Sequence, residues 1–272
     1  QEALRIVKEE QITVLMGAPV MLLELLKNQA FSDAHAAHLT NVSAGGAATP
    51  ELLSALYATK TGTAMSGGGW GMTETMGSGA AFTGRYFTER PSASGFPSPI
   101  VEFSFRDENG EAVPSGEPGE IWVRSSAAIQ GYFSGGNESD KPMDGWMGTG
   151  DIGYISGEGL LYICGRVKDM IISGGENISS VEIENVLYQH PAVGEAAVVA
   201  MPDELWGETP CAFIELKPDQ KTTEEDLISF CKDNMAQFKR PKKVIFGSLP
   251  KTATGKIQKH ELRSIIQNNG NG

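Results

Sequence analysis

Cysteine is scarce in this chain of 272 residues, which contains three: Cys164, Cys211 and Cys231. Their scattered positions offer no metal-binding spacing and are typical of a protein in a reducing compartment. Long apolar runs are missing as well, because none approaches the roughly 20 residues that a membrane-spanning helix needs. The chain opens without a signal-peptide pattern. We therefore expect a cytoplasmic protein without an integral membrane segment.

An excess of positive charge is also lacking. The formal net charge is −12, which argues against nucleic acid as the main partner. The basic residues near the C-terminus are nevertheless clustered, with only Asp233 and Glu261 opposing them: Lys232, Lys239, Arg240, Lys242, Lys243, Lys251, Lys256, Lys259 and Arg263. Such a basic end would attract a small polyphosphate as readily as a nucleic acid, unless it is only a solvated surface.

The length suits two domains or one large one. Residues 3–10, a segment opening at Pro19 and residues 50–59 have helical patterns, whereas residues 12–16 and 39–43 resemble buried strands. This alternation predicts an α/β layer. The first residue is Gln1 rather than Met, so we favour a truncated reading frame.

From Pro99 onward the pattern becomes antiparallel β, with short alternating strands and turns, and it changes again after Lys168 to a compact α+β arrangement. Two capping boxes, Ser179 to Glu182 and Thr222 to Glu225, are expected to open helices there. Three strands and a closing helix complete this part: residues 196–200, 210–216, 244–246 and a helix containing Leu262, Ile265 and Ile266.

A hairpin predicted from residues 152–155 and 160–164 has Asp151 and Arg166 flanking it. Counting outward from the turn brings these two residues near one another at the open end. An acid that accepts from two hydroxyls beside a guanidinium donor suits a sugar diol such as ribose. The alternative is a surface ion pair.

Glycines surround one aromatic residue in the segment from Ser66 to Glu74. A serine-hydrolase turn would need glycine at the position of Ala64, so that class is disfavoured. Glycines around Trp70 indicate either a ring lying between backbone and side chain or a core tryptophan in a turn. Near the C-terminus, a phosphate-binding P-loop is excluded because Pro250 and Ile257 occupy positions that require glycine and Ser/Thr.

Four motifs, taken together, resemble those of the adenylate-forming (AMP-binding) enzymes, the superfamily of acyl- and aryl-CoA synthetases, peptide-synthetase adenylation domains and luciferases. They occur in the family's order: residues 70–74, 149–151, 165–178 and 250–256. The chain is similar to the C-terminal half of such a protein, close to benzoate-type and fatty acyl-CoA ligases. The resemblance implies the C-terminal part of a large α/β domain with a small β-barrel at residues 1–167, followed by a small mobile α+β domain at residues 168–272.

The resemblance also implies a nucleotide site. Lys256 would be the catalytic lysine, Thr73 would contact the α-phosphate, and Glu74 would bind Mg²⁺. The wider set expected to contact ATP or AMP is Gly45, Gly46, Ala47, Trp70, Gly71, Met72, Thr73, Asp151, Arg166 and Lys256. Lys168 would be the hinge about which the smaller domain rotates.

Coenzyme A is the expected second substrate. Paired glycines leave backbone without side chains, as a pantetheine tunnel needs, and aromatic faces with cations suit a phosphorylated purine. By resemblance to benzoate-type ligases, the CoA-binding residues would be Gly174, Gly175, Trp206, Phe238, Arg240 and Lys242. A hydrophobic edge with surface cations is the alternative interpretation of the Phe238 segment.

The expected reaction joins a carboxylic acid to CoA through an acyl-adenylate, with ATP and Mg²⁺. A phosphate loop rich in Ser, Thr and Gly would lie upstream of Gln1, and the fragment alone would be inactive. Two alternatives stay open: another adenylate-forming enzyme, serving a carrier protein or resembling luciferase, and a non-catalytic nucleotide-binding module.

Overall fold

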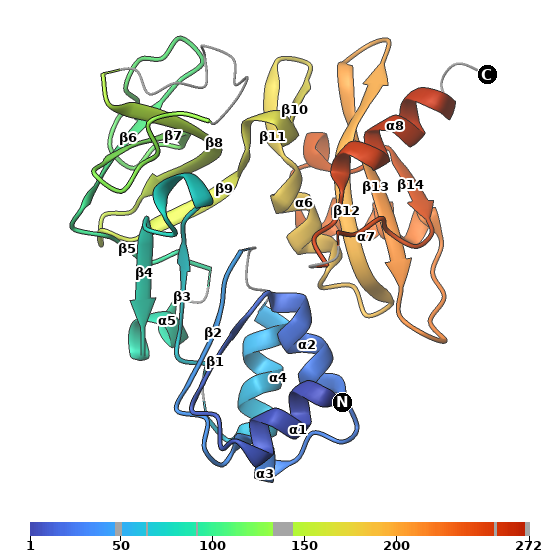
Figure 1. The fold of residues 1–272 in the computed structure, drawn as a ribbon. Helices are drawn as coiled ribbons and strands as arrows, with labels where there is room; N and C mark the ends of the chain where they lie inside the picture. The colour runs from blue at the N-terminus through green and yellow to red at the C-terminus, as the bar shows by residue number, and fades with distance from the viewer. Residues whose placement is uncertain (47–50, 64, 91, 133–143, 253–254, 270–272) are drawn as a thin grey trace. The chain divides into compact units, whose positions relative to one another are not determined.

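The computed structural model describes residues 1–272 except 47–50, 64, 91, 133–143, 253–254 and 270–272 (Figure 1). The chain divides into two compact units, residues 1–163 and 164–272. The domain boundary expected from the sequence lies slightly later, at Lys168, and its role as a hinge stays a prediction. The α/β and α+β character of the two parts is confirmed by the elements described below.

The first unit opens with an α/β layer. Its elements are α1 (Glu2–Glu9), β1 (Val14–Gly17), α2 (Pro19–Lys27), α3 (Asp33–Ala36), β2 (Asn41–Ala44), α4 (Glu51–Thr61), β3 (Gly67–Trp70), η1 (Thr73–Thr75), β4 (Ala80–Thr83), α5 (Arg85–Glu89) and β5 (Phe96–Pro97). The strands form one sheet in sequence order. Pairing is parallel from β1 to β3 and antiparallel from β3 to β5. Pro19 occupies the first turn of α2, as expected, because its missing N–H is not needed there.

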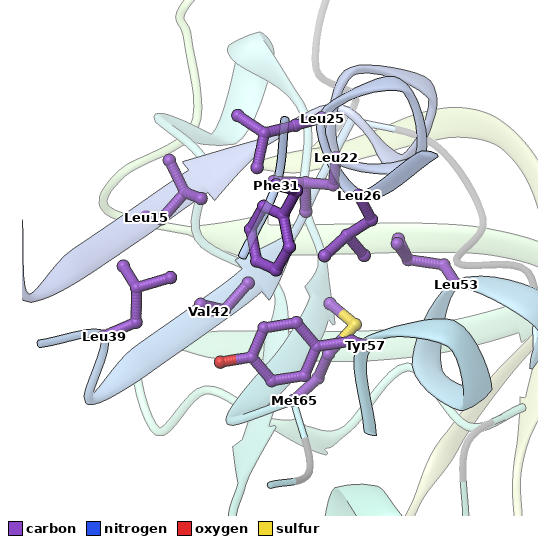
Figure 2. A pocket seen from close by; sticks show the side chains of 10 residues that line it. All are labelled: Leu15, Leu22, Leu25, Leu26, Phe31, Leu39, Val42, Leu53, Tyr57 and Met65. Atoms are coloured by element: carbon purple, nitrogen blue, oxygen red, sulfur yellow. The ribbon is translucent and has the colours of Figure 1, made fainter. Parts of the chain in front are cut away.

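The core of this layer lies between the sheet and helices α2 and α4 (Figure 2). Leu22, Leu53 and Tyr57 are buried in it and line a small cavity of about 10 Å³ together with Phe31 and Met65. That volume holds at most a single water molecule, and the lining is almost wholly apolar. The cavity is therefore a packing defect of the core and not a binding pocket.

The glycine run at residues 67–69 is a strand that ends at Trp70, whereas one of the two interpretations of the sequence placed this tryptophan in a turn. The reason is the close approach of β4. A Cβ atom at Gly67 would lie 2.6 Å from the Phe82 carbonyl oxygen, and one at Gly69 would lie 2.5 Å from that of Ala80. Side chains at these positions would force the two backbones apart.

A second sheet follows in the order β6 (Val101–Arg106), β7 (Gly119–Ser125), β8 (Trp146–Ile155) and β9 (Leu161–Arg166). The expected turn joins β8 to β9, with the Ser156 amide donating to the Leu160 carbonyl at 2.9 Å. The expected small barrel is not observed: within the described residues these strands form an open sheet. They succeed one another as a meander, and no pairing returns the chain from β9 to β6, so the sheet keeps two edges.

The second unit is an α+β arrangement on one main sheet. Its elements are η3 (Val167–Asp169), β10 (Met170–Ser173), β11 (Glu176–Ser179), α6 (Ser180–Leu187), β12 (Val193–Asp203), β13 (Gly207–Leu216), α7 (Glu224–Asn234), η4 (Gln237–Lys239), β14 (Lys243–Phe246) and α8 (Lys259–Asn269). One apolar cluster joins the sheet to α6 and α7 through Ile183, Leu187 and Leu227. Another joins it to α8 through Leu262 and Ile266.

Side chains from α6 and from its C-cap residue, Tyr188, bond to the backbone of β12. The Glu184 carboxylate accepts from the Val198 amide at 2.7 Å, and the Tyr188 hydroxyl donates to the Ala196 carbonyl at 3.3 Å. Burial raises the pKa of Tyr188 to about 12. Burial also raises the pKa of Glu184, although Lys259 lies 2.6 Å away and opposes the shift. These two bonds satisfy backbone groups of β12 that are otherwise open to pairing with another strand.

The second capping box lies one residue later than the sequence indicated. Ser179 caps α6 as expected, its hydroxyl accepting from the Glu182 amide. At α7, however, the cap is Thr223 rather than Thr222: the Thr223 hydroxyl accepts from the Asp226 amide at 3.1 Å, and the Asp226 carboxylate accepts from the Thr223 amide. Both pairs fit the spacing rule, so the spacing alone does not distinguish them.

We expect Thr223→Ala to lower the free energy of unfolding by about 1 kcal/mol, because it removes the hydroxyl that satisfies an amide at the start of α7. Thr222→Ala is the matched control and should change it by less than about 0.5 kcal/mol. Urea denaturation followed by circular dichroism measures both. Equal effects of the two substitutions would contradict the observed cap.

Candidate functional site

A tryptophan and an aspartate meet in the first unit across 81 residues of sequence. The Trp70 indole N–H donates to Asp151 Oδ2 at 2.8 Å. Only 7% of Asp151 is exposed, so its polar side-chain atoms need hydrogen-bond partners within the protein. The sequence assigned both residues to a nucleotide site but gave no sign that they are bonded to one another.

The indole itself is held by its neighbours. Trp70 is the last residue of β3, paired with Ala80 of β4. A Cβ atom at Gly79 would lie 2.6 Å from Cε3 of the indole, so the bare backbone of Gly79 runs against the ring. The Phe103 ring lies 5.8 Å away at a tilt of 54°. These contacts fix the direction in which the indole N–H points.

The backbone that carries Asp151 is held from the other side. The Asp151 amide donates to the Thr149 hydroxyl at 3.1 Å, and that hydroxyl donates to the Ile121 carbonyl at 2.8 Å. Thr149 is itself buried. Both bonds lie within the second sheet, which therefore fixes the position of the carboxylate.

Thr73 and Glu74 lie on η1, directly after the Trp70 strand. Thr73 is exposed, and Glu74 accepts from the Tyr132 hydroxyl at 2.9 Å. The backbone of this turn is tied down, because the Glu74 carbonyl accepts from the Ile129 amide at 2.8 Å. Gly71 lies so close to Gly77 that a Cβ atom there would be 2.3 Å from its carbonyl oxygen. The neighbouring Met72 packs against the apolar cluster of the second sheet.

Glu74 fits a magnesium ion that is shared with a nucleotide. The described residues contain no group of three His, Cys, Asp or Glu side chains placed to hold a metal by themselves. Mg²⁺ usually keeps several waters and binds one or two carboxylates together with substrate phosphates. One partly exposed carboxylate on a fixed turn meets that requirement.

The loop after β2 is open. Gly45 donates to the Gly17 carbonyl at 3.2 Å, and a Cβ atom at Gly45 or Gly46 would meet nothing within 4 Å. The backbone at these two glycines is therefore not crowded by described neighbours. Ala47 lies outside the described residues.

The second unit brings four of its predicted residues together with an unpredicted one. The Gly174 amide donates to the Trp206 carbonyl at 2.9 Å, and Lys242 Nζ lies 5.5 Å from the centroid of the Trp206 ring. Asp203 accepts from the Trp206 amide at 2.9 Å and from Lys242 Nζ at 3.2 Å. The pKa of Asp203 is lowered, first by the Trp206 amide and then by Lys242. Gly175 completes the turn between β10 and β11.

The Trp206 indole leaves no room for a side chain at position 174, so glycine is needed there. Its φ is +60°, and a Cβ atom there would lie 2.6 Å from Cε3 of Trp206. The exposed fraction of Trp206 is 46%, which leaves aromatic surface for a ligand. Phe238 is also exposed, and a different lysine lies over each ring: Lys239 over Phe238 and Lys242 over Trp206.

The basic cluster near the C-terminus is largely neutralised by carboxylates from distant parts of the sequence, which corrects the expectation of a basic end. The pairs are Lys239–Glu182, Lys242–Asp203, Lys251–Glu195, Lys259–Glu184 and Arg263–Asp169. Among the cluster's nine basic residues, the described contacts leave four without an ion pair: Lys232, Arg240, Lys243 and Lys256. Two of these, Arg240 and Lys256, are predicted site residues.

Lys256 is exposed at the end of a tight turn. Its amide donates to the Thr252 hydroxyl at 3.1 Å, and its carbonyl accepts from the Thr252 amide at 2.9 Å. Ala253 and Thr254 of the same motif lie outside the described residues. The next residue, Ile257, packs against the core beneath α8. The backbone of Lys256 is thus anchored while its side chain reaches into solvent.

Arg263 of α8 makes contacts that the sequence did not reveal. Its guanidinium donates to the Lys168 carbonyl at 3.1 Å and to the Asp169 carboxylate. Lys168 lies on η3 near the start of the second unit. Arg166 precedes it at the end of β9, and its predicted cooperation with Asp151 at a ribose stays a prediction.

Comparison with known proteins agrees with the motifs. The family model for AMP-binding enzyme matches residues 1–133, and that for AMP-binding enzyme C-terminal domain matches residues 182–256. A probable acyl-activating enzyme 8 from Arabidopsis thaliana is 42% identical over 282 residues, which is 97% of this chain and 51% of that protein. An acetate–CoA ligase, CCL3, from Humulus lupulus is 51% identical over 158 residues, which is 56% of this chain and 28% of that ligase.

Among solved structures, ATP-bound MatB from Rhodopseudomonas palustris superposes with a TM-score of 0.88 at 31% identity, covering 98% of this chain and 53% of MatB. The chain thus spans about half the length of the relatives that it matches from end to end. The fold, the two family matches and these relatives show that the chain belongs to the adenylate-forming (AMP-binding) enzyme superfamily. In the part of the chain that the structure describes, no helix is long and apolar enough to cross a membrane.

We expect Gly174→Ala to destabilise the second unit more than Gly175→Ala does. Both positions have positive φ, so alanine at either one should lower the free energy of unfolding by about 1 kcal/mol. Only at position 174 does the added methyl group meet the Trp206 indole, which should lower the free energy of unfolding by about 1–3 kcal/mol more. Urea denaturation gives the difference, and the Trp206 emission should shift only in Gly174→Ala. Equal destabilisation would contradict the contact between Gly174 and the indole.

Proposed function

We propose that the chain is the C-terminal half of an ATP-dependent acyl-CoA synthetase. A carboxylate attacks the α-phosphorus of ATP, giving an acyl-adenylate and pyrophosphate. The CoA thiol then attacks the acyl carbon, and AMP leaves. The observation that carries this proposal is the buried Asp151 carboxylate, which accepts a hydrogen bond from Trp70 at the end of a glycine-rich strand. Relatives of the chain are named as CoA ligases or acyl-activating enzymes.

The nucleotide-binding residues have distinct roles in this proposal. Asp151 accepts from the ribose hydroxyls, and the loop at Gly45, Gly46 and Ala47 lies against adenine. Thr73 donates to the α-phosphate, and Glu74 would hold Mg²⁺, which screens the phosphate charge when bound. Gly71 and Met72 shape the turn that presents them, and Arg166 contributes a fixed cation beside the ribose.

Lys256 supplies positive charge where negative charge develops between the attacking carboxylate and the α-phosphate. Its exposed side chain and the absence of an ion pair in its described surroundings support this role, because a neutralised lysine would stabilise an anion less. Rotation about Lys168 would carry Lys256 toward the nucleotide for the first step and away from it for the second.

The CoA site is proposed on the second unit. The bare backbone of Gly174 and Gly175 admits pantetheine, and Trp206 and Phe238 offer exposed aromatic faces for adenine. Arg240 is a cation without an ion pair in the described structure and suits a phosphate of CoA. Lys242 is paired with Asp203, so in this proposal it lies over the Trp206 ring and would have to exchange Asp203 for a CoA phosphate. The same proposal includes a fatty or aromatic acid as the first substrate. It also includes a location in the cytoplasm. The names of some relatives include the word peroxisomal.

A second adenylate-forming activity, with a carrier protein as acceptor, uses the same first step. Comparing the turnover of the full-length protein with CoA and with a holo-carrier protein as acceptor distinguishes the two activities. The exposed Trp206 with Lys242 over its ring favours CoA. A non-catalytic nucleotide-binding module would bind ATP without exchanging pyrophosphate, so ATP–pyrophosphate exchange tests the proposal as a whole.

We expect Lys256→Ala in the full-length protein to lower acid-dependent ATP–pyrophosphate exchange by about 100-fold or more, since it removes charge that stabilises the transition state. Thioester formation from a supplied acyl-adenylate should be nearly unchanged. Lys243→Ala, which removes another exposed lysine without an ion pair in the described structure, is the control and should leave both half-reactions intact. Equal loss of both half-reactions in Lys256→Ala would overturn the role of Lys256.

A further inference from the structure

The residues before and after the turn that carries Lys256 pair with one another. Lys251 forms an antiparallel bridge with Ile257, and the Thr252 amide donates to the Lys256 carbonyl at 2.9 Å. The backbone of Lys256 is therefore placed by the segment that contains Lys251.

The side chain of Lys251 ties this segment to the main sheet of the second unit. Its Nζ lies 2.7 Å from Oε2 of Glu195 on β12 and 3.7 Å from Oε2 of Glu215 on β13. These two glutamates are directly opposite one another in the sheet, where like charges are unfavourable unless a cation lies with them. Glu215 also accepts from the Leu249 amide at 3.1 Å. The two carboxylates thus hold the segment by its backbone at Leu249 and by its side chain at Lys251.

We propose that Lys251 is a positioning residue for Lys256: its ion pairs with Glu195 and Glu215 fix the segment before Lys256 and so determine whether the Lys256 ammonium is placed correctly at the α-phosphate. The inference rests on the proposed function, in which Lys256 stabilises the charge that develops in the first step. The lysine side chain is a flexible four-carbon stem, so the placement of its ammonium depends on how firmly its backbone is held. A displacement of about 1 Å at a reacting centre can lower a rate by about 100-fold.

The ion pairs of Lys251 are too exposed to matter much for stability. The exposed side-chain fractions are 28% for Lys251, 30% for Glu195 and 38% for Glu215, and such pairs contribute little to the free energy of unfolding. Leu249 and Ile257 pack into the apolar cluster at α8 independently of them. Loss of the Lys251 charge should therefore leave the second unit folded and displace mainly the turn.

The first unit contains a matched control for this arrangement. Arg90 also lies between two carboxylates, 3.0 Å from Glu89 and 2.6 Å from Glu158, and its exposed side-chain fraction is 29%. None of the predicted site residues takes part in these pairs. Arg90→Met therefore removes a cation shared by two carboxylates without altering the segment before Lys256.

The test compares the two half-reactions in the full-length protein. Lys251→Met, which keeps an unbranched side chain and removes the charge, should lower kcat of acid-dependent ATP–pyrophosphate exchange by about tenfold. The KM for ATP should change by less than about twofold, because the lost placement acts on the transition state. Thioester formation from a supplied acyl-adenylate should be nearly unchanged. Lys251→Arg, which retains the charge, should recover most of the exchange rate, and Arg90→Met should alter neither half-reaction.

A double substitution shows whether Lys251 acts through Lys256. In the Lys256→Ala background, Lys251→Met should slow the residual exchange no further, since no ammonium is left to be placed. Glu195→Gln combined with Glu215→Gln removes the same ion pairs from the side of the sheet. It should lower kcat of exchange as Lys251→Met does, and it replaces that variant should Lys251→Met fail to fold.

Four results would overturn the inference while leaving the proposed function standing. Lys251→Met exchanges at the wild-type rate, it slows both half-reactions equally, Lys251→Arg is as slow as Lys251→Met, or the effect of Lys251→Met is undiminished in the Lys256→Ala background. If the wild type shows no acid-dependent exchange, or Lys256→Ala leaves the exchange intact, the proposed function itself fails at Lys256 and the inference falls with it.

Discussion

Close contact between a tryptophan ring and a bare stretch of backbone occurs among the candidate site residues of each unit. In the first unit the Trp70 indole lies on Gly79, and in the second the Trp206 indole lies on Gly174. A Cβ atom at either glycine would approach Cε3 of its indole to 2.6 Å, well inside van der Waals contact. Each ring is thereby held in one orientation with a charged partner, Asp151 for Trp70 and Lys242 for Trp206.

Local patterns predicted most of the fold. Pro19, the apolar spacing of α1 and α2, and the Ser179 cap are set by neighbours in sequence, and all were found where expected. Three details depend on contacts that a local pattern does not contain. Gly67 and Gly69 became strand because β4 packs tightly on them, Thr223 rather than Thr222 caps α7, and the β6–β9 meander stays open.

The candidate site was predicted as a set of residues but not as a set of contacts. The resemblance named Trp70 and Asp151, yet the bond between them spans 81 positions and has no signature in either segment. Charge was the least predictable property. Near the C-terminus the sequence shows many lysines and few acids, and the acids that neutralise them, such as Glu182 and Glu195, come from α6 and β12. Arg263 was missed for the same reason.

The terminal helix α8 has a consequence for how the second unit holds together. Ile257 and Leu262 pack on the sheet on either side of its start, Lys259 neutralises buried Glu184, and Arg263 reaches back to the Lys168 carbonyl. Helix α8 is therefore an integral part of the packing of the second unit. A truncation before Lys259 would expose the apolar face of the sheet that α8 covers. It would also leave the Glu184 carboxylate without Lys259 and remove the bond from Arg263 to the Lys168 carbonyl. Affinity tags and fusions are better joined well beyond α8 or at the other end of the protein.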